Sequence, residues 1–324
     1  MNIYYGVQVI IISFKKNHVQ KKYNIWYNIV WIYEWSWFFL EGIITIDKPT
    51  GITSFDVIRK LRKILKERRI GHTGTLDPLA TGVLVICVGR ATKLAQDIEG
   101  YDKTYIADFQ LGYRTDTYDT EGKILEKVEN FNVSKEDLEN SLRKFIGNIG
   151  QIPPMYSAIK IDGKKLYELA REGKEIERAS RPVTINKIEL LDFDGINGKI
   201  LCEVSKGTYI RSLIDDLGKD LGVYATMSGL RRTQVGGETL EKSYTLEEIE
   251  KCVLESDYEF IRSVENYFNF EPVNIDSGKD KTLYLNGQRV KMQKPDGKCR
   301  VYCDGIFLGL GEINRGLLKG YKYY

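Results

Sequence analysis

The order of apolar and polar residues predicts a chain of short strands and amphipathic helices. The continuous apolar run Val83–Val88 has the length of a strand and indicates one that is buried. The stretch Lys103–Gly112 alternates polar and apolar residues, which is typical of a half-buried strand. Helical spacing of five apolar residues predicts a helix with one buried stripe, made of Val57, Ile58, Leu61, Ile64 and Leu65.

Capping and turn signals extend this pattern along the chain. Ser54 is the predicted N-cap of the first helix, with Asp56 in its first turn. Further helices are predicted over Ala91–Glu99, from Ser134, over Thr245–Val253 and over Asp257–Tyr267, and further strands over Arg181–Asp194 and Lys199–Ser205. After Pro272, short alternating runs are separated by one Asn-Gly and two Asp-Gly pairs, which are hairpin signals. We therefore predict a small all-β module at residues 272–324.

Residues 1–40 differ in composition from the rest of the chain. They contain all four tryptophans, and the apolar stretch Asn24–Leu40 is interrupted by Asn28 and Glu34. This stretch is shorter than the roughly 20 apolar residues that cross a bilayer, and it lacks the cleavage site of a signal peptide. We expect residues 1–40 to be unstructured or a mis-assigned start, because a TTG codon at Leu40 could initiate translation. A membrane or partner anchor is the alternative.

Charge and cysteine content restrict the classes of site. Residues 1–40 hold four lysines and one glutamate, so the remainder has equal numbers of basic and acidic residues. A nucleic-acid partner would then require local basic patches. Five dispersed cysteines favour a reducing compartment over a disulfide framework. Cys299 and Cys303 lack a second Cys or His pair, which disfavours a zinc site.

The stretch Gly71–Gly89 combines a polar, glycine-rich loop with the start of the buried strand. Asp77 precedes Pro78 and is therefore held in a non-helical conformation. Polar loops anchored to a rigid core are common places for function. Ordinary turns use the same residue types, so this local pattern alone leaves both interpretations open.

The longer string GHTGTLDPLATGVL resembles the catalytic-loop motif of the bacterial tRNA pseudouridine-55 synthase (TruB) family, whose nucleophilic aspartate corresponds to Asp77. The segments KTYIA and KGTYIRSL resemble motifs whose residues correspond to Tyr105, Tyr209 and Arg211. The segment GLRRT resembles a further motif in which Leu230 packs near the nucleotide, and QIPPMYSAIK begins a segment that grips RNA in the family. Only the Gly236-Gly237-Glu238 turn departs from the family pattern.

The resemblance implies an α+β pseudouridine synthase fold, with a large mixed, mainly antiparallel sheet and flanking helices, followed by a PUA-like RNA-binding domain. The implied boundaries are residues 41–244 for the catalytic domain, 245–271 for a helical connector and 272–324 for the PUA-like domain. The implied activity is isomerisation of uridine 55 in the T-arm of tRNA, without a cofactor or metal. We expect a cytoplasmic protein with tRNA as its partner and no obligate protein partner or membrane.

The resemblance also gives the candidate residues their roles. Asp77 forms a covalent adduct, and whether it attacks the sugar C1′ or the base is left open. Tyr105 stacks on the flipped base and is a candidate to move a proton in the rearrangement, and Arg211 pairs with Asp77. Tyr209 and Leu230 line the pocket, and His72 contacts the RNA near the flipped nucleotide.

Two other functions fit the same sequence. One is a pseudouridine synthase acting on another RNA or within an RNA-guided complex. The other is a non-catalytic RNA-binding or RNA-folding protein, which would not need Asp77, Tyr105 and Arg211. The basic residues of the first helix, and those between Lys160 and Arg181, are either phosphate contacts or solvated surface. Lys319 and Lys322 are further candidates for phosphate contacts.

Overall fold

A computed structural model describes residues 40–161 and 163–324, and residues from Leu40 to Tyr324 form one compact unit. The predictions about residues 1–39 lie outside the described residues. Of the helices in the described ranges, none is long and apolar enough to cross a membrane.

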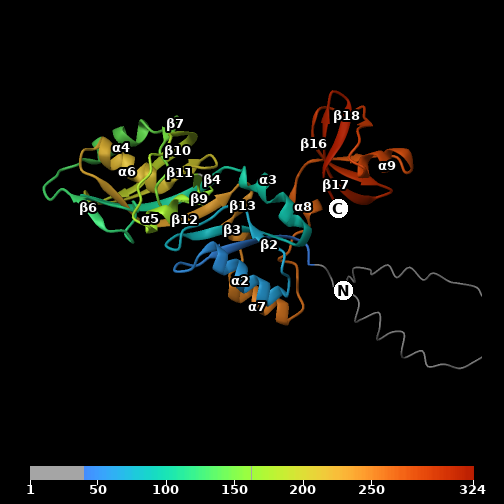
Figure 1. The fold of residues 1–324 in the computed structure, drawn as a ribbon, viewed down its shortest axis with the longest axis horizontal. Coiled ribbons are helices and arrows are strands. Elements are labelled where there is room, and N and C mark those ends of the chain that lie inside the picture. Colours follow the sequence, from blue (N-terminus) through green and yellow to red (C-terminus); the bar gives the residue numbers. More distant parts are fainter. Residues whose placement is uncertain (1–39, 162) are drawn as a thin grey trace, which may run out of the picture. The chain divides into compact units, whose positions relative to one another are not determined.

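A large sheet forms the centre of the part of the chain that precedes the C-terminal β module (Figure 1). Among the described residues it has nine strands, and every pairing is antiparallel except the one between β12 and β3. The main order is β1 (Gly42–Lys48), β3 (Thr81–Val88), β12 (Ala225–Val235), β4 (Lys103–Leu111), β11 (Asn197–Val204), β10 (Arg181–Phe193) and β7 (Gly147–Gln151), with β2 (Ile70–His72) beside β3 and β13 (Glu238–Thr239) beside β12. The predicted mixed, mainly antiparallel sheet is thus confirmed.

Strand β3 is buried on both faces, whereas β4 is buried on one. Side chains of β3 alternate between two apolar clusters, so its continuous apolar run is buried on both faces. In β4 only alternate residues are buried, among them Tyr105 and Phe109. The parallel contact between β3 and β12 depends on Gly82, whose φ of +102° and position opposite Arg232 leave no room for a side chain.

Helices lie against this sheet at places that the apolar spacing predicts. Helix α2 (Ser54–Leu65) buries its apolar stripe and lies beside α7 (Leu246–Leu254) (Figure 1). Its N-cap is Thr53, not Ser54, because the Thr53 hydroxyl and the Asp56 carboxylate form a reciprocal capping box. Helix α6 (Ile210–Asp220) packs on β12 and β4.

Shorter elements connect these parts. They are η1 (Gly89–Leu94), α3 (Ala95–Glu99), β5 (Tyr113–Thr115), β6 (Ile124–Lys127), α4 (Lys135–Arg143), β8 (Lys160–Ile161), β9 (Lys164–Lys165), α5 (Leu166–Arg171), η2 (Leu240–Lys242) and α8 (Val264–Tyr267). The predicted helix over Asp257–Tyr267 is therefore wrong except for its last turn. The predicted helix over Ala91–Glu99 is split, since its first part is a 3₁₀ helix.

The C-terminal module is a small β domain with one helix. Its strands, in spatial order, are β14 (Glu271–Asn274), β16 (Gly297–Cys303), β17 (Ile306–Asn314), β18 (Leu317–Tyr323) and β15 (Val290–Lys291). The Asp304-Gly305 pair forms the predicted hairpin turn, with both residues at positive φ. The Asn286-Gly287 pair instead ends helix α9 (Lys279–Leu285), which forms because Tyr284 is fully buried and donates to the Leu310 carbonyl.

Candidate active site

The loop that carries Asp77 is held from both sides by the segment that follows β1. The Ser54 hydroxyl donates to the Leu76 carbonyl at 3.0 Å and accepts from the Leu76 amide at 2.8 Å. On the other side, the Gly51 amide donates to the Pro78 carbonyl at 2.9 Å. The backbone of Asp77 is therefore fixed before any substrate arrives. Of the three loop glycines, Gly82 has positive φ, whereas Gly71 and Gly74 do not.

Arg211 is the cation that faces Asp77. It comes from the first turn of α6, is buried, and places Nη2 3.0 Å from Oδ2 and 3.2 Å from Oδ1 of Asp77. The same guanidinium donates to the Thr117 carbonyl at 3.1 Å and to the Tyr156 carbonyl at 2.9 Å. Because several fixed acceptors surround it, Arg211 holds the Asp77 carboxylate in one orientation.

A second carboxylate, Asp119, completes this cluster and was missed from the sequence. Its Oδ2 lies 3.6 Å from Arg211 Nη1, and its side chain is only 5 % exposed. The Thr117 hydroxyl and the Glu121 amide both donate to its Oδ1, at 2.6 and 3.1 Å. Within the polar run Asp116–Gly122 only Asp119 is buried, and nothing in the local sequence distinguishes it from its neighbours.

Lys48 is a second residue that sequence reasoning missed. It is fully buried at the end of β1, and its Nζ donates to the carbonyls of Pro49 and Pro78 at 2.8 and 3.4 Å. Burial lowers the pKa of Lys48 to about 8, and the Asp77 charge opposes this fall. The signal was a lysine before proline at the end of an apolar strand.

The electrostatics of Asp77 reflect burial opposed by a cation. Burial raises the pKa of the Asp77 carboxyl, the Arg211 guanidinium lowers it, and the Asp119 charge raises it further. About a third of the Asp77 side chain (34 %) is still exposed. A carboxylate that is oriented, partly desolvated and open to solvent on one side is suited to act as a nucleophile.

Tyr105 and Leu230 lie on neighbouring central strands. Tyr105 is opposite Arg232 of β12, and Leu230 is opposite Ala107 of β4, so both side chains point to the same face of the sheet. Tyr105 belongs to the same apolar cluster as Leu76, which precedes Asp77, and Leu230 packs against that cluster. The structure thus brings Tyr105 and Leu230 to the side of the sheet that bears the Asp77 loop.

Tyr209 is the N-cap residue of α6, two positions before Arg211. The Gln151 side chain accepts from its amide at 2.8 Å and donates to its carbonyl at 3.0 Å. Burial raises the pKa of the Tyr209 hydroxyl. Gln151, the last residue of β7, thereby fixes the start of α6 and with it the position of Arg211.

His72 lies at the end of β2, ahead of the Asp77 loop. Its Nδ1 accepts from the Gly74 amide at 3.3 Å. Burial, and second the nearby charge of Arg232, lower the pKa of His72. The imidazole is therefore neutral at pH 7 and presents Nε2 as a hydrogen-bond donor.

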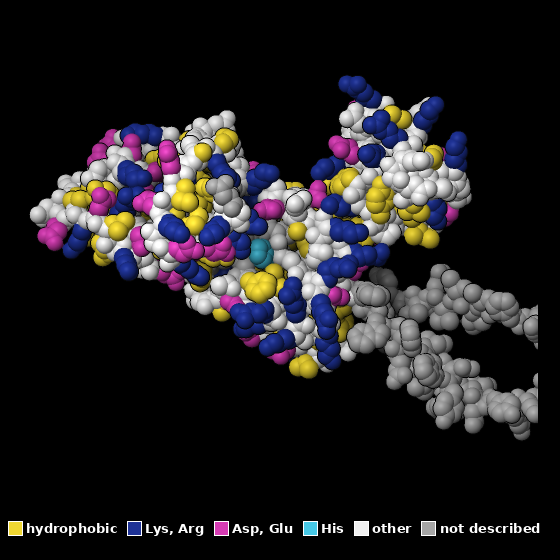
Figure 2. Space-filling view, in the orientation of Figure 1, with side chains coloured by type: hydrophobic (Ala, Val, Ile, Leu, Met, Phe, Trp, Pro, Cys, Tyr) yellow, Lys and Arg dark blue, Asp and Glu magenta, His cyan; other side chains and the backbone are white. Residues whose placement is uncertain are grey.

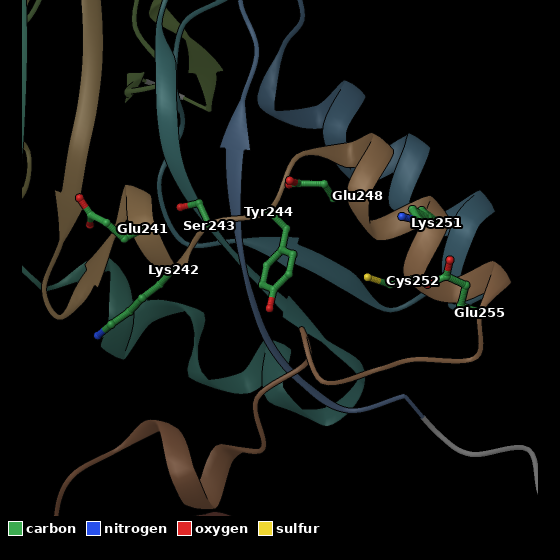
Figure 3. A pocket seen from close by; sticks show the side chains of 8 residues that line it. All are labelled: Glu241, Lys242, Ser243, Tyr244, Glu248, Lys251, Cys252 and Glu255. Carbon is green, nitrogen blue, oxygen red and sulfur yellow. The ribbon is translucent and has the colours of Figure 1, made fainter.

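Two surface features lie outside this cluster. Lys and Arg side chains gather over α2 (Figure 2). A hollow of about 380 Å³ lies along α7 (Figure 3), and its side chains are those of Glu241, Lys242, Ser243, Tyr244, Glu248, Lys251, Cys252 and Glu255. It contains none of the predicted site residues. Of the two C-terminal lysines, Lys319 is exposed, whereas Lys322 donates to the Lys93 carbonyl and is thus engaged within the protein.

The sequence matches one protein family along most of its length. Residues 62–210 match the N-terminal domain of TruB family pseudouridylate synthases, residues 211–267 the tRNA pseudouridylate synthase B C-terminal domain, and residues 273–321 the C-terminal domain of pseudouridine synthase II TruB. The tRNA pseudouridine synthase B of Fusobacterium nucleatum is 58 % identical over 88 % of this chain and all of its own length. The chain belongs to the TruB family. The tRNA pseudouridine synthase B of Clostridium novyi is 45 % identical over 86 % of this chain and 98 % of its own length.

Solved structures share the fold of this chain. A chain of an H/ACA RNP bound to a substrate RNA containing 2′-deoxyuridine superposes with a TM-score of 0.64 at 24 % identity, over 88 % of this chain and 86 % of its own. A chain of a Cbf5-Nop10-Gar1 complex gives 0.62 at 26 % identity, over 85 % and 78 %. These likenesses support the pseudouridine synthase fold.

In the described parts of the chain, the side chains that could bind a metal ion are not grouped around one site. Within residues 40–161 and 163–324, no group of three or more His, Cys, Asp or Glu side chains is placed to hold an ion. All five cysteines are free.

Proposed function

We propose that this protein is a tRNA pseudouridine synthase that converts uridine 55 in the T-arm of tRNA to pseudouridine, with Asp77 as nucleophile. The observation that supports it most is the buried Arg211, which contacts the Asp77 carboxylate while anchored to two backbone carbonyls. Relatives named tRNA pseudouridine synthase B, up to 58 % identical, support the reaction and the substrate class.

The reaction needs a nucleophile, rotation of the uracil so that C5 faces C1′, and proton transfer. The bond between C1′ and N1 of uracil breaks, a bond between C1′ and C5 forms, C5 loses its proton and N1 gains one. Asp77 forms the covalent adduct, at C1′ or at the base, and is displaced again in the second half of the reaction. Arg211 favours the ionised form of Asp77 before attack and again after Asp77 is displaced, and it orients the carboxylate.

The remaining site residues hold the RNA. A uridine in a folded arm is first turned out of its stack, and Tyr105 provides an aromatic face for it. Tyr209 and Leu230 line the pocket. The neutral His72 donates a hydrogen bond to the RNA beside the place in the stack that the flipped uridine has left. Residues 41–244 form the catalytic domain, residues 245–271 the connector and residues 272–324 a PUA-like domain that contacts tRNA. The five free thiols fit a cytoplasmic location.

Release of tritium from 5-tritiated uridine tests this function directly. A T-arm transcript labelled at its uridines should release tritium with wild-type protein and none with Asp77→Asn. A transcript in which uridine 55 is replaced by cytidine is the matched substrate control. Release from other RNAs but not from the T-arm would favour the alternative substrate, and binding without release would favour a non-catalytic RNA-binding protein.

A further inference from the structure

An exposed aromatic side chain, Phe55, lies in the first turn of α2. Its side chain is 54 % exposed. Among the large hydrophobic side chains with high exposure in the described part of the chain, only Tyr258 is also aromatic. A single exposed phenylalanine is not unusual, so its surroundings decide whether it has a role.

Two arginines from the same helix approach the Phe55 ring. The guanidinium carbon of Arg59 lies 5.9 Å from the ring centroid and that of Arg62 lies 5.8 Å from it. Residues Ser54–Arg69 hold seven Lys or Arg against two acidic residues, and Figure 2 shows Lys and Arg side chains beside a hydrophobic patch over α2. An aromatic face bordered by cations is the arrangement that proteins use for unpaired bases and their phosphates.

Phe55 is joined to the catalytic loop through its neighbour. Ser54 makes two hydrogen bonds to Leu76, which directly precedes Asp77. Consecutive Cα atoms are about 3.8 Å apart, so Phe55 and Asp77 project from adjoining backbone. Phe55 is thus one residue from a direct contact with the Asp77 loop, within the length of an RNA segment bound at Asp77.

We propose that Phe55 is a stacking platform for an unpaired base next to the target uridine, with Arg59 and Arg62 neutralising the adjoining phosphates. This inference rests on the proposed function, because it takes the RNA held at Asp77 as the ligand. The apolar area is a single ring within a basic surface, which suits one base and is too small for a protein or lipid partner.

Photocrosslinking tests the contact in the wild-type protein. 5-Iodouridine is placed at one unpaired position of the T-arm transcript at a time, and the crosslinked residue is located by mass spectrometry. We expect Phe55 to be crosslinked from a loop position adjacent to uridine 55. Crosslinks from every loop position that map only to other residues would overturn the proposal.

Binding of the same transcript to three variants gives a second test. We expect Phe55→Leu to raise Kd about tenfold and KM with it, because stacking on an aromatic ring is lost, while kcat stays within about twofold. Phe55→Tyr keeps a ring and should bind like wild type. Tyr258→Leu is the matched control, since Tyr258 is exposed beside Asp257 and Glu259, and it should leave Kd unchanged.

The outcomes separate this inference from the proposed function. If wild type releases tritium and Phe55→Leu binds within twofold of it, the stacking platform is wrong and the synthase assignment stands. If wild type releases none, the synthase assignment is wrong. Thermal unfolding of Phe55→Leu should match wild type because the ring is exposed, and a loss of affinity with an unchanged Tm supports the contact.

Discussion

Replacing Arg211 perturbs Asp77, the proposed nucleophile, through a single cation. Two unit charges about 3 Å apart interact by roughly 5 kcal/mol at an effective dielectric constant near 20. Asp77 is one-third exposed, so solvent screening reduces this to about 2–3 kcal/mol. We therefore expect Arg211→Met to lower kcat/KM about 100-fold at neutral pH.

The pH dependence identifies the cause of that loss. The Arg211 charge lowers the pKa of Asp77, so removing it raises this pKa. If Asp77 must be ionised to react, the acid limb of the kcat/KM profile moves to higher pH in Arg211→Met. Arg211→Lys retains the charge but not the planar fork, so it should lose rate with a smaller displacement of the acid limb.

Stability provides the control for this experiment. Arg211→Met leaves the buried Asp119 without its cation, and removing one partner of a buried pair costs about 3–5 kcal/mol of unfolding free energy. Arg114→Met removes one of the two cations that pair with the buried Asp215, since Arg114 Nε and Lys219 Nζ each lie 2.6 Å from its carboxylate. Both variants should unfold more easily, but only Arg211→Met should move the acid limb. Identical acid limbs in Arg211→Met and wild type would refute the electrostatic role.

Three further changes test other parts of the site. Asp77→Asn should abolish turnover while RNA affinity stays within a few-fold, and tritium release at a comparable rate would disprove its role as nucleophile. Tyr105→Phe should keep RNA affinity but lose most activity, because the proposed proton transfer by the Tyr105 hydroxyl is removed, whereas Tyr105→Ala should also weaken binding by about 1–3 kcal/mol; equal binding by the two would argue against stacking. Lys48 is charged in both states below pH 8 but only in the unfolded state between about pH 8 and 10.5. Wild type should therefore gain about 2 kcal/mol of unfolding free energy over Lys48→Met between pH 7 and pH 10 in urea titrations, and a constant difference would contradict the lowered pKa.

The sequence predicted those helices and strands in which a single pattern of apolar residues runs through the whole element. Helix α2 and strands β3 and β4 have uninterrupted helical, continuous or alternating patterns, and the structure confirms all three. Helix α9 was missed because the burial of Tyr284 outweighs an Asn-Gly turn signal. The N-cap was placed one residue late because Ser54 and Thr53 both qualify, and only the hydrogen bonds distinguish them.

Site residues were harder to predict where their contacts come from distant parts of the chain. Asp77 and Arg211 lie in motifs that a resemblance can identify. Asp119 and Lys48 act through contacts that local sequence does not contain, since Asp119 meets an arginine from α6 and Lys48 meets a carbonyl of the Asp77 loop. Such contacts follow from the sheet order, which brings β1, β3, β12 and β4 together.

The surroundings of Gly82 predict how the stretch that carries Asp77 tolerates mutation. A Cβ atom at Gly82 would lie 2.1 Å from the Arg232 carbonyl oxygen. The φ of Gly82, +102°, is a second reason why a residue with a side chain does not fit there. At Gly74 the nearest atom to a Cβ would be an Arg232 nitrogen at 3.7 Å, an ordinary contact. In a library that randomises both positions, only glycine should be recovered at 82, whereas alanine should survive at 74. Two glycines eight residues apart in one motif thus differ in what they require. Position 82 must be glycine because backbone packs against it, whereas position 74 has no steric requirement for glycine.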